Sequence, residues 1–243
     1  MHRLAQISYL SLIALFLNCN IATGEILRLT TSDGPPHMIR ETDSGLDIDV
    51  TRAVLERMGY QLEISYMPLT RAQAEVRYKR ADLTVPIFTG TVEGLHISAP
   101  AIQYRPTAFT LKSRQLSLQA LPELRHYRVM TFQGATGYFG QQFVLATEQA
   151  PEYIEYHDMS RLPVLLAAAR TDVVVLDYYI FYHYLSQAEN AGEIGDYNAH
   201  ELFPRVPAAV GFADRHLRDL FNQTLEEIRS DGSYQRILKQ YTE

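Results

Sequence analysis

The chain has 243 residues, a formal net charge of −6 at pH 7 and one cysteine. It has no run of basic residues of the kind that binds nucleic acid, and no second long apolar segment follows the N-terminal one. The sequence therefore points away from a nucleic-acid-binding or membrane-spanning protein. A chain of this length can form one large domain or two lobes of ~100 residues each.

The first 24 residues have the parts of a secretory signal peptide. Arg3 supplies the positive charge, residues 9–17 form a short apolar run, and small residues at 22 and 24 precede a cleavage site. We place this site between Gly24 and Glu25 and expect an exported, periplasmic protein. The alternative is a buried N-terminal helix.

The single cysteine, Cys19, lies inside this segment. It can be interpreted as a lipoprotein anchor, but Asn18 is a poor match to the small residue that usually precedes a lipidated cysteine. Without lipidation the secreted chain has no cysteine, so it needs no disulfide in an oxidising compartment.

Residues 45–66 predict a helix that leads into a strand. Four apolar residues lie on one helical face, and the period then changes to two from residue 60 to 66; the helical positions are Val50, Ala53, Val54 and Met58. We expect Asp47 and Asp49 to cap free N–H groups at the helix start and Gly59 to end the helix in a left-handed conformation. With a strand near residues 27–29, the segment is a βαβ unit.

Strands and helices alternate along the rest of the chain. We expect strands at 82–88, 102–111, 128–132, 173–176 and 206–212, and helices at 70–79, 138–145, 162–170, 177–186, 217–228 and 234–241. Pro86 marks a bulge or a sheet edge. Alternation of this kind predicts an α/β fold with mostly parallel sheets.

Short motifs along the chain resemble those of bacterial periplasmic solute-binding proteins of family 3, the amino-acid-binding family. The motifs are G-L-D-I-D at 45–49, R-A-D at 80–82, T-V-E at 91–93, S-A-P at 98–100, F-Q-G-A-T at 132–136, A-R-T-D at 169–172 with Asp177, and the segment 222–240 with its D-G-S-Y turn. Each is weak alone, but their order and spacing together are specific.

The resemblance implies a type II periplasmic binding fold with two lobes and two hinge crossovers. The first lobe would contain residues 25–110 and 208–243, and the second residues 111–207, with crossovers near 109–112 and 207–211. A ligand would bind between the lobes, beyond the carboxyl ends of the strands, and close them by a hinge motion.

Several residues are candidate ligand contacts. The turn at 134–137 presents N–H groups at a helix start, where Thr136 and Gly137 can seat a carboxylate, although an ordinary strand–helix turn has the same sequence. Asp177 matches the family residue that holds the ligand's ammonium group, and it is equally suited to cap a helix. The resemblance also implies contacts from the first ligand loop, with Asp33 and His37, and from Thr89.

The chain departs from the family pattern at the usual aromatic positions, which are His37 and Leu46, and at the arginine that clamps the ligand. Amino-acid binders carry an arginine after T-x-E that clamps the ligand carboxylate, whereas this chain has Gly94 there and no arginine between Ala81 and Tyr104. Arg71 or Arg105 can replace it, or each can be a solvated surface charge. The ligand is therefore left open.

We expect a monomeric binding protein that captures a small polar, amino-acid-like or carboxylate-bearing ligand for an ABC-type membrane permease, with no cofactor, metal or nucleic acid. No motif of a common enzyme class occurs. Two alternatives remain: a ligand sensor for a membrane receptor, and a periplasmic dehydratase or lyase on the same fold, with Glu93, Asp177 and His37 as acid and base.

Overall fold

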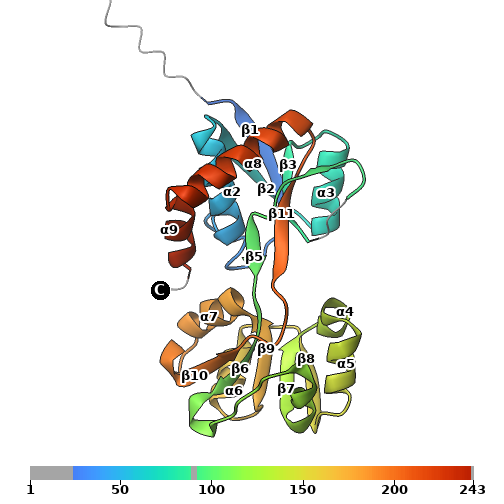
Figure 1. Cartoon of the computed structure of the whole chain (residues 1–243), viewed down its shortest axis with the longest axis vertical. Helices are drawn as coiled ribbons and strands as arrows, with labels where there is room; N and C mark the ends of the chain where they lie inside the picture. Colours follow the sequence, from blue (N-terminus) through green and yellow to red (C-terminus); the bar gives the residue numbers. More distant parts are fainter. Residues whose placement is uncertain (1–23, 89–91, 242–243) are drawn as a thin grey trace, which may run out of the picture.

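The computed structural model describes residues 24–88 and 92–241, which form two α/β lobes stacked along the long axis (Figure 1). The predicted signal peptide, Cys19 and Thr89 lie outside the described residues. Among the described residues, no helix has the length and apolar character needed to cross a membrane.

The first lobe has a six-stranded sheet in the order β2-β1-β3-β11-β4, with β5 paired to β11. Its strands are β1 (Ile26–Thr31), β2 (Gln61–Tyr66), β3 (Leu83–Ile87), β4 (His96–Ile97), β5 (Ile102–Tyr104) and β11 (Val206–Phe212). Its helices are α2 (Leu46–Arg57), α3 (Leu69–Arg77), α8 (Arg215–Ser230) and α9 (Ser233–Lys239). Leu29, Leu83 and Phe212 form the centre of its core together with Phe221 of α8.

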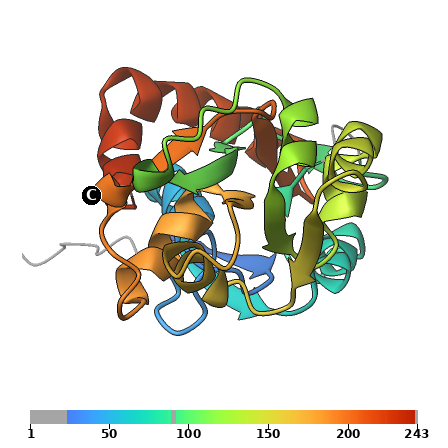
Figure 2. The same cartoon turned by 90° about the horizontal axis from the view of Figure 1, so that it is seen from below.

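The second lobe has a five-stranded sheet in the order β10-β6-β9-β7-β8. Its strands are β6 (Pro106–Leu111), β7 (Arg128–Phe132), β8 (Glu152–Tyr156), β9 (Val173–Asp177) and β10 (Tyr197–His200). Its helices are α4 (Ala135–Phe139), α5 (Gln141–Thr147), α6 (Arg161–Ala167) and α7 (Tyr178–Gln187), with 3-10 turns η1 (Lys112–Arg114), η2 (Leu121–His126) and η3 (Ile194–Asp196). In two views α7 and the α4–α5 pair lie at opposite sides of this lobe (Figures 1 and 2).

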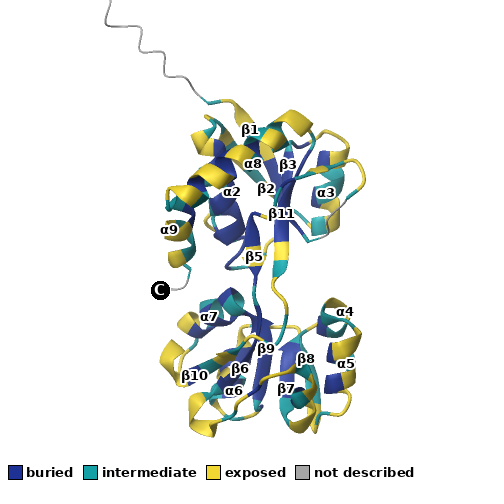
Figure 3. Cartoon of the chain, in the orientation of Figure 1, coloured by how far each residue is buried: buried dark blue, intermediate teal, exposed yellow. Residues whose placement is uncertain are grey.

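Strand β9 is buried along its whole length (Figure 3). Val174 and Leu176 pack into one core cluster, with Phe109 and Phe181, while Val173 and Val175 pack into a second one on the other face of the sheet. This alternation explains the continuous apolar run in the sequence, because a strand covered on both faces has no polar side.

Most strands of each sheet point the same way, as predicted, and one strand in each sheet runs against the others. Each has a parallel core, β2-β1-β3 in the first lobe and β8-β7-β9 in the second. The strands that carry the chain between the lobes run antiparallel to these cores: β11 beside β3, and β6 beside β9. The crossing strand enters each sheet from the cleft side and runs away from the cleft, whereas the parallel strands run toward it.

Strand pairing places both crossings earlier than the sequence predicted. The expected single strand at 102–111 is two strands, since β5 pairs with β11 in the first sheet and β6 pairs with β9 in the second. The chain therefore crosses at Arg105, not at 109–112. It returns between β10 and β11, at 201–205. We propose these positions as the lobe boundaries, in place of 110 and 207.

Two local predictions are settled by backbone geometry. The register between β3 and β11 shifts where Val85 and Pro86 oppose one residue, so Pro86 lies at a bulge as predicted. The helix predicted at 138–145 is wrong in its bounds: it is two helices, α4 and α5, separated at Gly140, whose φ of 77° is unfavourable for other residues.

Candidate functional site: a cavity at the strand ends between the lobes

A cavity of about 200 Å³ lies where carboxyl ends of strands from both lobes meet. Phe88 follows β3 and Tyr104 ends β5, while the remaining walls come from the second lobe. The lining residues are Phe88, Tyr104, Pro106, Phe132, Tyr138, Phe139, Met159, Leu176, Asp177 and Ile180. Asp177 is the only one of them with a charged side chain.

Asp177 ends β9 and begins α7, and its carboxylate is 8% exposed. Oδ1 accepts hydrogen bonds from the backbone N–H groups of Tyr179, at 2.9 Å, and Ile180, at 3.4 Å, so it caps the helix as predicted. Oδ2 accepts one from the backbone N–H of Arg105, at 2.6 Å. The carboxylate thereby fixes the point where the chain crosses between the lobes.

His37 joins the two lobes through a pair of carboxylates. Its Nδ1 lies 2.8 Å from Oδ2 of Asp47, and its Nε2 lies 3.3 Å from Oδ1 of Asp177. The ring stacks on Tyr104 at a centroid distance of 3.8 Å. Burial opposes a charge on the imidazole, but the hydrogen bonds to Asp177 and Asp47 outweigh it and raise the pKa of His37 to about 9. His37 is therefore an imidazolium at neutral pH.

Backbone hydrogen bonds join the loop at 34–38, which carries His37, to the start of α2. The carbonyls of Pro36 and His37 accept hydrogen bonds from the N–H groups of Leu46 and Asp47 at the start of α2. Gly45 allows this approach, because its φ is 125° and a Cβ there would lie 2.4 Å from the His37 carbonyl oxygen. Asp47 points at His37 and does not cap α2, which corrects the prediction for that residue, and α2 has no side-chain cap.

The turn at 134–137, which was predicted to bind a ligand carboxylate, binds a carboxylate of the chain itself. Glu155 of β8 accepts hydrogen bonds from the N–H groups of Gly134, at 2.8 Å, and Thr136, at 3.1 Å. Tyr153 donates a third from its hydroxyl, at 2.7 Å. Burial acts against the charge, but these donors outweigh it and lower the pKa of Glu155 below its usual value. Two of the donors predicted to meet a ligand carboxylate, the N–H groups of Gly134 and Thr136, are thus bound to Glu155.

Replacing Glu155 by alanine should cost about 1 kcal/mol of unfolding free energy, because three hydrogen bonds to a partly exposed carboxylate are lost and water replaces them in part. Since the pKa is lowered in the folded state, this contribution is present above about pH 4.5 and is lost as the pH falls through the folded pKa. Urea denaturation at pH 7 and pH 3.5 measures it. Glu152→Ala, exposed on the same strand, is the control; equal stabilities of the two variants at pH 7 would contradict the role of Glu155.

The other predicted contacts do not converge on the cavity. Asp33 is exposed and accepts a hydrogen bond from the N–H of Arg40. The Arg71 side chain is 70% exposed and lies 3.8 Å from Glu75. The Arg105 guanidinium pairs with Glu201 at 2.7 Å and lies over the ring of Tyr178. Gly137 lies within α4 and does not line the cavity.

Sequence reasoning missed Asp47 as a partner of His37, the aromatic wall formed by Phe88, Tyr104 and Tyr138, and the role of Glu155. The sequence signal for the aromatic wall was position, because Phe88 and Phe132 each lie at or directly after the end of a predicted strand. Nothing local in the sequence indicates that Glu155 reaches the turn at 134, because the pairing of β7 with β8 brings them together.

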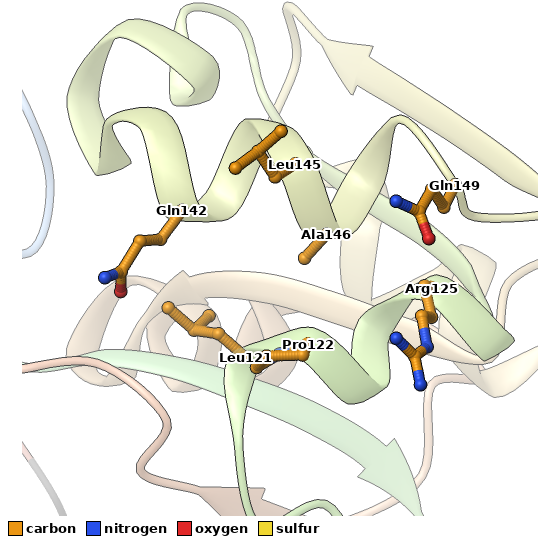
Figure 4. Close-up of a pocket in the computed structure, with 7 residues that line it drawn as sticks. All are labelled: Leu121, Pro122, Arg125, Gln142, Leu145, Ala146 and Gln149. Atoms are coloured by element: carbon orange, nitrogen blue, oxygen red, sulfur yellow. The ribbon is translucent and has the colours of Figure 1, made fainter.

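A larger hollow of about 380 Å³ lies between η2 and α5 (Figure 4). Its lining comes from the second lobe alone, with Leu121, Pro122 and Arg125 on one side and Gln142, Leu145, Ala146 and Gln149 on the other (Figure 4). A ligand there would contact the second lobe alone and would not connect the lobes. No group of three metal-ligating side chains suited to a metal ion occurs in residues 24–88 and 92–241.

Two mixed α/β lobes joined by two crossing segments, with a cavity at the facing strand ends, define a solute-binding protein of the type II periplasmic binding fold. The sequence matches the family described as bacterial extracellular solute-binding proteins, family 3, over residues 27–243. The chain belongs to this family, and the resemblance inferred from its motifs is confirmed.

Individual relatives are distant. The chain is 23% identical over 222 residues to the arginine-binding extracellular protein ArtP of Bacillus subtilis, covering 87% of this chain and 84% of ArtP. Among solved structures, an ancestral cationic amino acid solute-binding protein gives a TM-score of 0.72 at 18% identity, covering 90% of this chain and 96% of the other. The L-cystine solute receptor of Neisseria gonorrhoeae, in an unliganded open conformation, gives 0.70 at 16% identity, covering 90% and 94%. These structures support the fold.

Proposed function

We propose that the protein captures a small solute in the cavity between its lobes and presents it to an ABC-type permease. The cavity carries this proposal: its walls come from the strand ends of both lobes, so a bound molecule would contact both and favour their closed arrangement. The curated relatives support the transport role, since one is named as a probable amino-acid ABC transporter-binding protein of Haemophilus influenzae.

We further propose that it acts in the periplasm, as a monomer, after removal of residues 1–24. Members of the family are extracellular solute-binding proteins, and this supports an exported location. A sensor for a membrane receptor would share the same capture step. For the lyase alternative, His37 and Asp177 are in contact, but Glu93 is exposed and does not line the cavity. We therefore propose binding without covalent chemistry.

A thermal-shift screen of the secreted chain against amino acids, small carboxylates, amines and oligosaccharides tests this proposal. A ligand that binds only the folded state, at ~100 times its dissociation constant, adds about 2.7 kcal/mol of stability. Tyr138→Ala should weaken the binding of any ligand found by tenfold or more, because Tyr138 forms a wall of the cavity and is exposed enough to be replaced without loss of the core.

Tyr78→Ala is the matched control, since Tyr78 is also an exposed tyrosine but lies at the end of α3, away from the cavity. Binding that is unaffected by Tyr138→Ala, or the absence of any stabilising compound in the screen, would contradict the proposed function.

A further inference from the structure

The cavity is small and mostly apolar. At about 200 Å³ it is smaller than the ~300–1,000 Å³ typical of sites for drug-sized ligands, so its ligand has few heavy atoms. Five of its lining residues are aromatic: Phe88, Tyr104, Phe132, Tyr138 and Phe139. Aromatic faces attract an organic cation and stack against an apolar or aromatic group, and they offer no charge to bind an anion.

The buried charges beside the cavity leave a surplus negative charge. The two carboxylates of Asp47 and Asp177 face one imidazolium, that of His37. If His37 were neutral, the net negative charge of these three side chains would be larger. Arg105, at the crossing, is not among the lining residues; its guanidinium pairs with Glu201 and lies over the ring of Tyr178, while its buried Nε has no hydrogen-bond partner among the described residues. A protonated amine in the cavity would balance the remaining charge.

Asp177 has a lone pair available for such a group. Its Oδ1 already receives three donors, from His37, Tyr179 and Ile180, whereas Oδ2 receives only the N–H of Arg105. Each carboxylate oxygen has two lone pairs, so Oδ1 is saturated by its donors, whereas Oδ2 uses one of its two. Oδ2 can therefore accept a further hydrogen bond from an ammonium group, and the low polarity of the surrounding walls strengthens this interaction.

Among the described residues that line the cavity, a ligand carboxylate has no comparable partner. None of them is a cation, the Arg71 side chain is 70% exposed and outside the lining, and the N–H groups of Gly134 and Thr136 are bound to Glu155. A carboxylate in the cavity would lie near Asp177 without compensation, and an unpaired charge in an apolar site is strongly disfavoured.

We infer that the ligand is a small organic amine, bound as its ammonium ion, with an apolar or aromatic body and no carboxylate. The ammonium group hydrogen-bonds to Oδ2 of Asp177, and the body lies against Phe88, Tyr104 and Tyr138. This inference rests on the proposed capture function and names the class of solute captured.

Matched pairs of compounds test the inference by isothermal titration calorimetry on the secreted chain. Each amine is the corresponding amino acid without its carboxylate: benzylamine and phenylglycine, phenethylamine and phenylalanine, isoamylamine and leucine. We expect at least one amine to bind at least tenfold more tightly than its amino acid. Asp177→Asn keeps the size and an acceptor oxygen but removes the charge, and should weaken amine binding at least tenfold. Asp214→Asn, at the N-cap of α8 and away from the cavity, is the control.

The outcomes separate the two proposals. Tighter binding of the amino acid in any pair that binds, or no binding of any of the three amines, would overturn the amine assignment. If the wider screen then finds a different ligand whose binding depends on Tyr138, the capture function stands without the amine assignment. If neither experiment finds a ligand, both fail. Amine binding that Asp177→Asn and Asp214→Asn change equally would also overturn the assignment.

Discussion

Raising the pH from 6.5 to 9.5 is expected to lower the unfolding free energy by about 3 kcal/mol through His37 alone. The pKa of His37 is about 9 in the folded protein, above the 6.5 of the free side chain, so the folded state holds the proton more tightly. The resulting stability is fully present below pH 6.5 and is lost as the pH rises through about 9. The groups that face the ring are Asp47, Asp177, Tyr104 and Tyr179.

Urea denaturation between pH 6.5 and 9.5 measures this loss. Unfolded tyrosines begin to ionise at the upper end of this range, because their pKa is about 10, whereas burial raises the pKa of Tyr138 to about 12 in the folded protein and also raises that of Tyr104. The contribution of His37 is therefore the difference in pH dependence between the wild type and His37→Gln, which should lose about 3 kcal/mol of it. His183→Gln, on the half-buried part of α7, should leave the slope unchanged. A wild-type stability that is constant over this range would contradict the imidazolium.

Asp177→Ala should cost about 3–5 kcal/mol, the largest effect we expect from a single substitution. It removes one of the two carboxylates of a buried imidazolium, the N-cap of α7 and the acceptor for the N–H of Arg105. These groups are buried, so water cannot replace the lost partner as it does at an exposed cap.

Asp214→Ala is the matched control, because Asp214 also caps a helix, through the N–H of Leu217, but is exposed. Its loss should cost about 1 kcal/mol, the usual value for a cap. Equal losses for the two variants in urea denaturation would show that Asp177 acts only as a cap. Such a result would exclude a structural role for the link between His37 and Asp177.

The fold was predictable because its signals are local. The helix and strand at 45–66, the strand at 128–132 and the strand at 206–212 follow from periodicity and turn residues alone. The position of the first crossing was not predictable, because residues 102–111 have the sequence pattern of a single extended strand. Their division at Arg105 depends on which sheet each half pairs with, and pairing is not local.

The site was predictable only in part, for a similar reason. Asp177 follows a buried strand and could be placed from its position, and His37 from its loop. The partners that decide their chemistry are distant in sequence: Asp177 is 140 residues from His37. Glu155 shows the same limit, because the turn at 134–136 has the pattern of an anion seat whether the anion is a ligand or the chain's own side chain.

Strand β11 lies between β3 and β4 in the first sheet, although it is made nearly 120 residues after β3, at positions 206–212 against 83–87. The second sheet, by contrast, is built from the continuous segment 106–200. As the chain is delivered from its N-terminus, the second lobe can therefore complete its sheet while the first still lacks an interior strand. Until β11 arrives, β3 presents an unpaired apolar edge, so the N-terminal half of the chain is the part exposed to misassociation before folding ends.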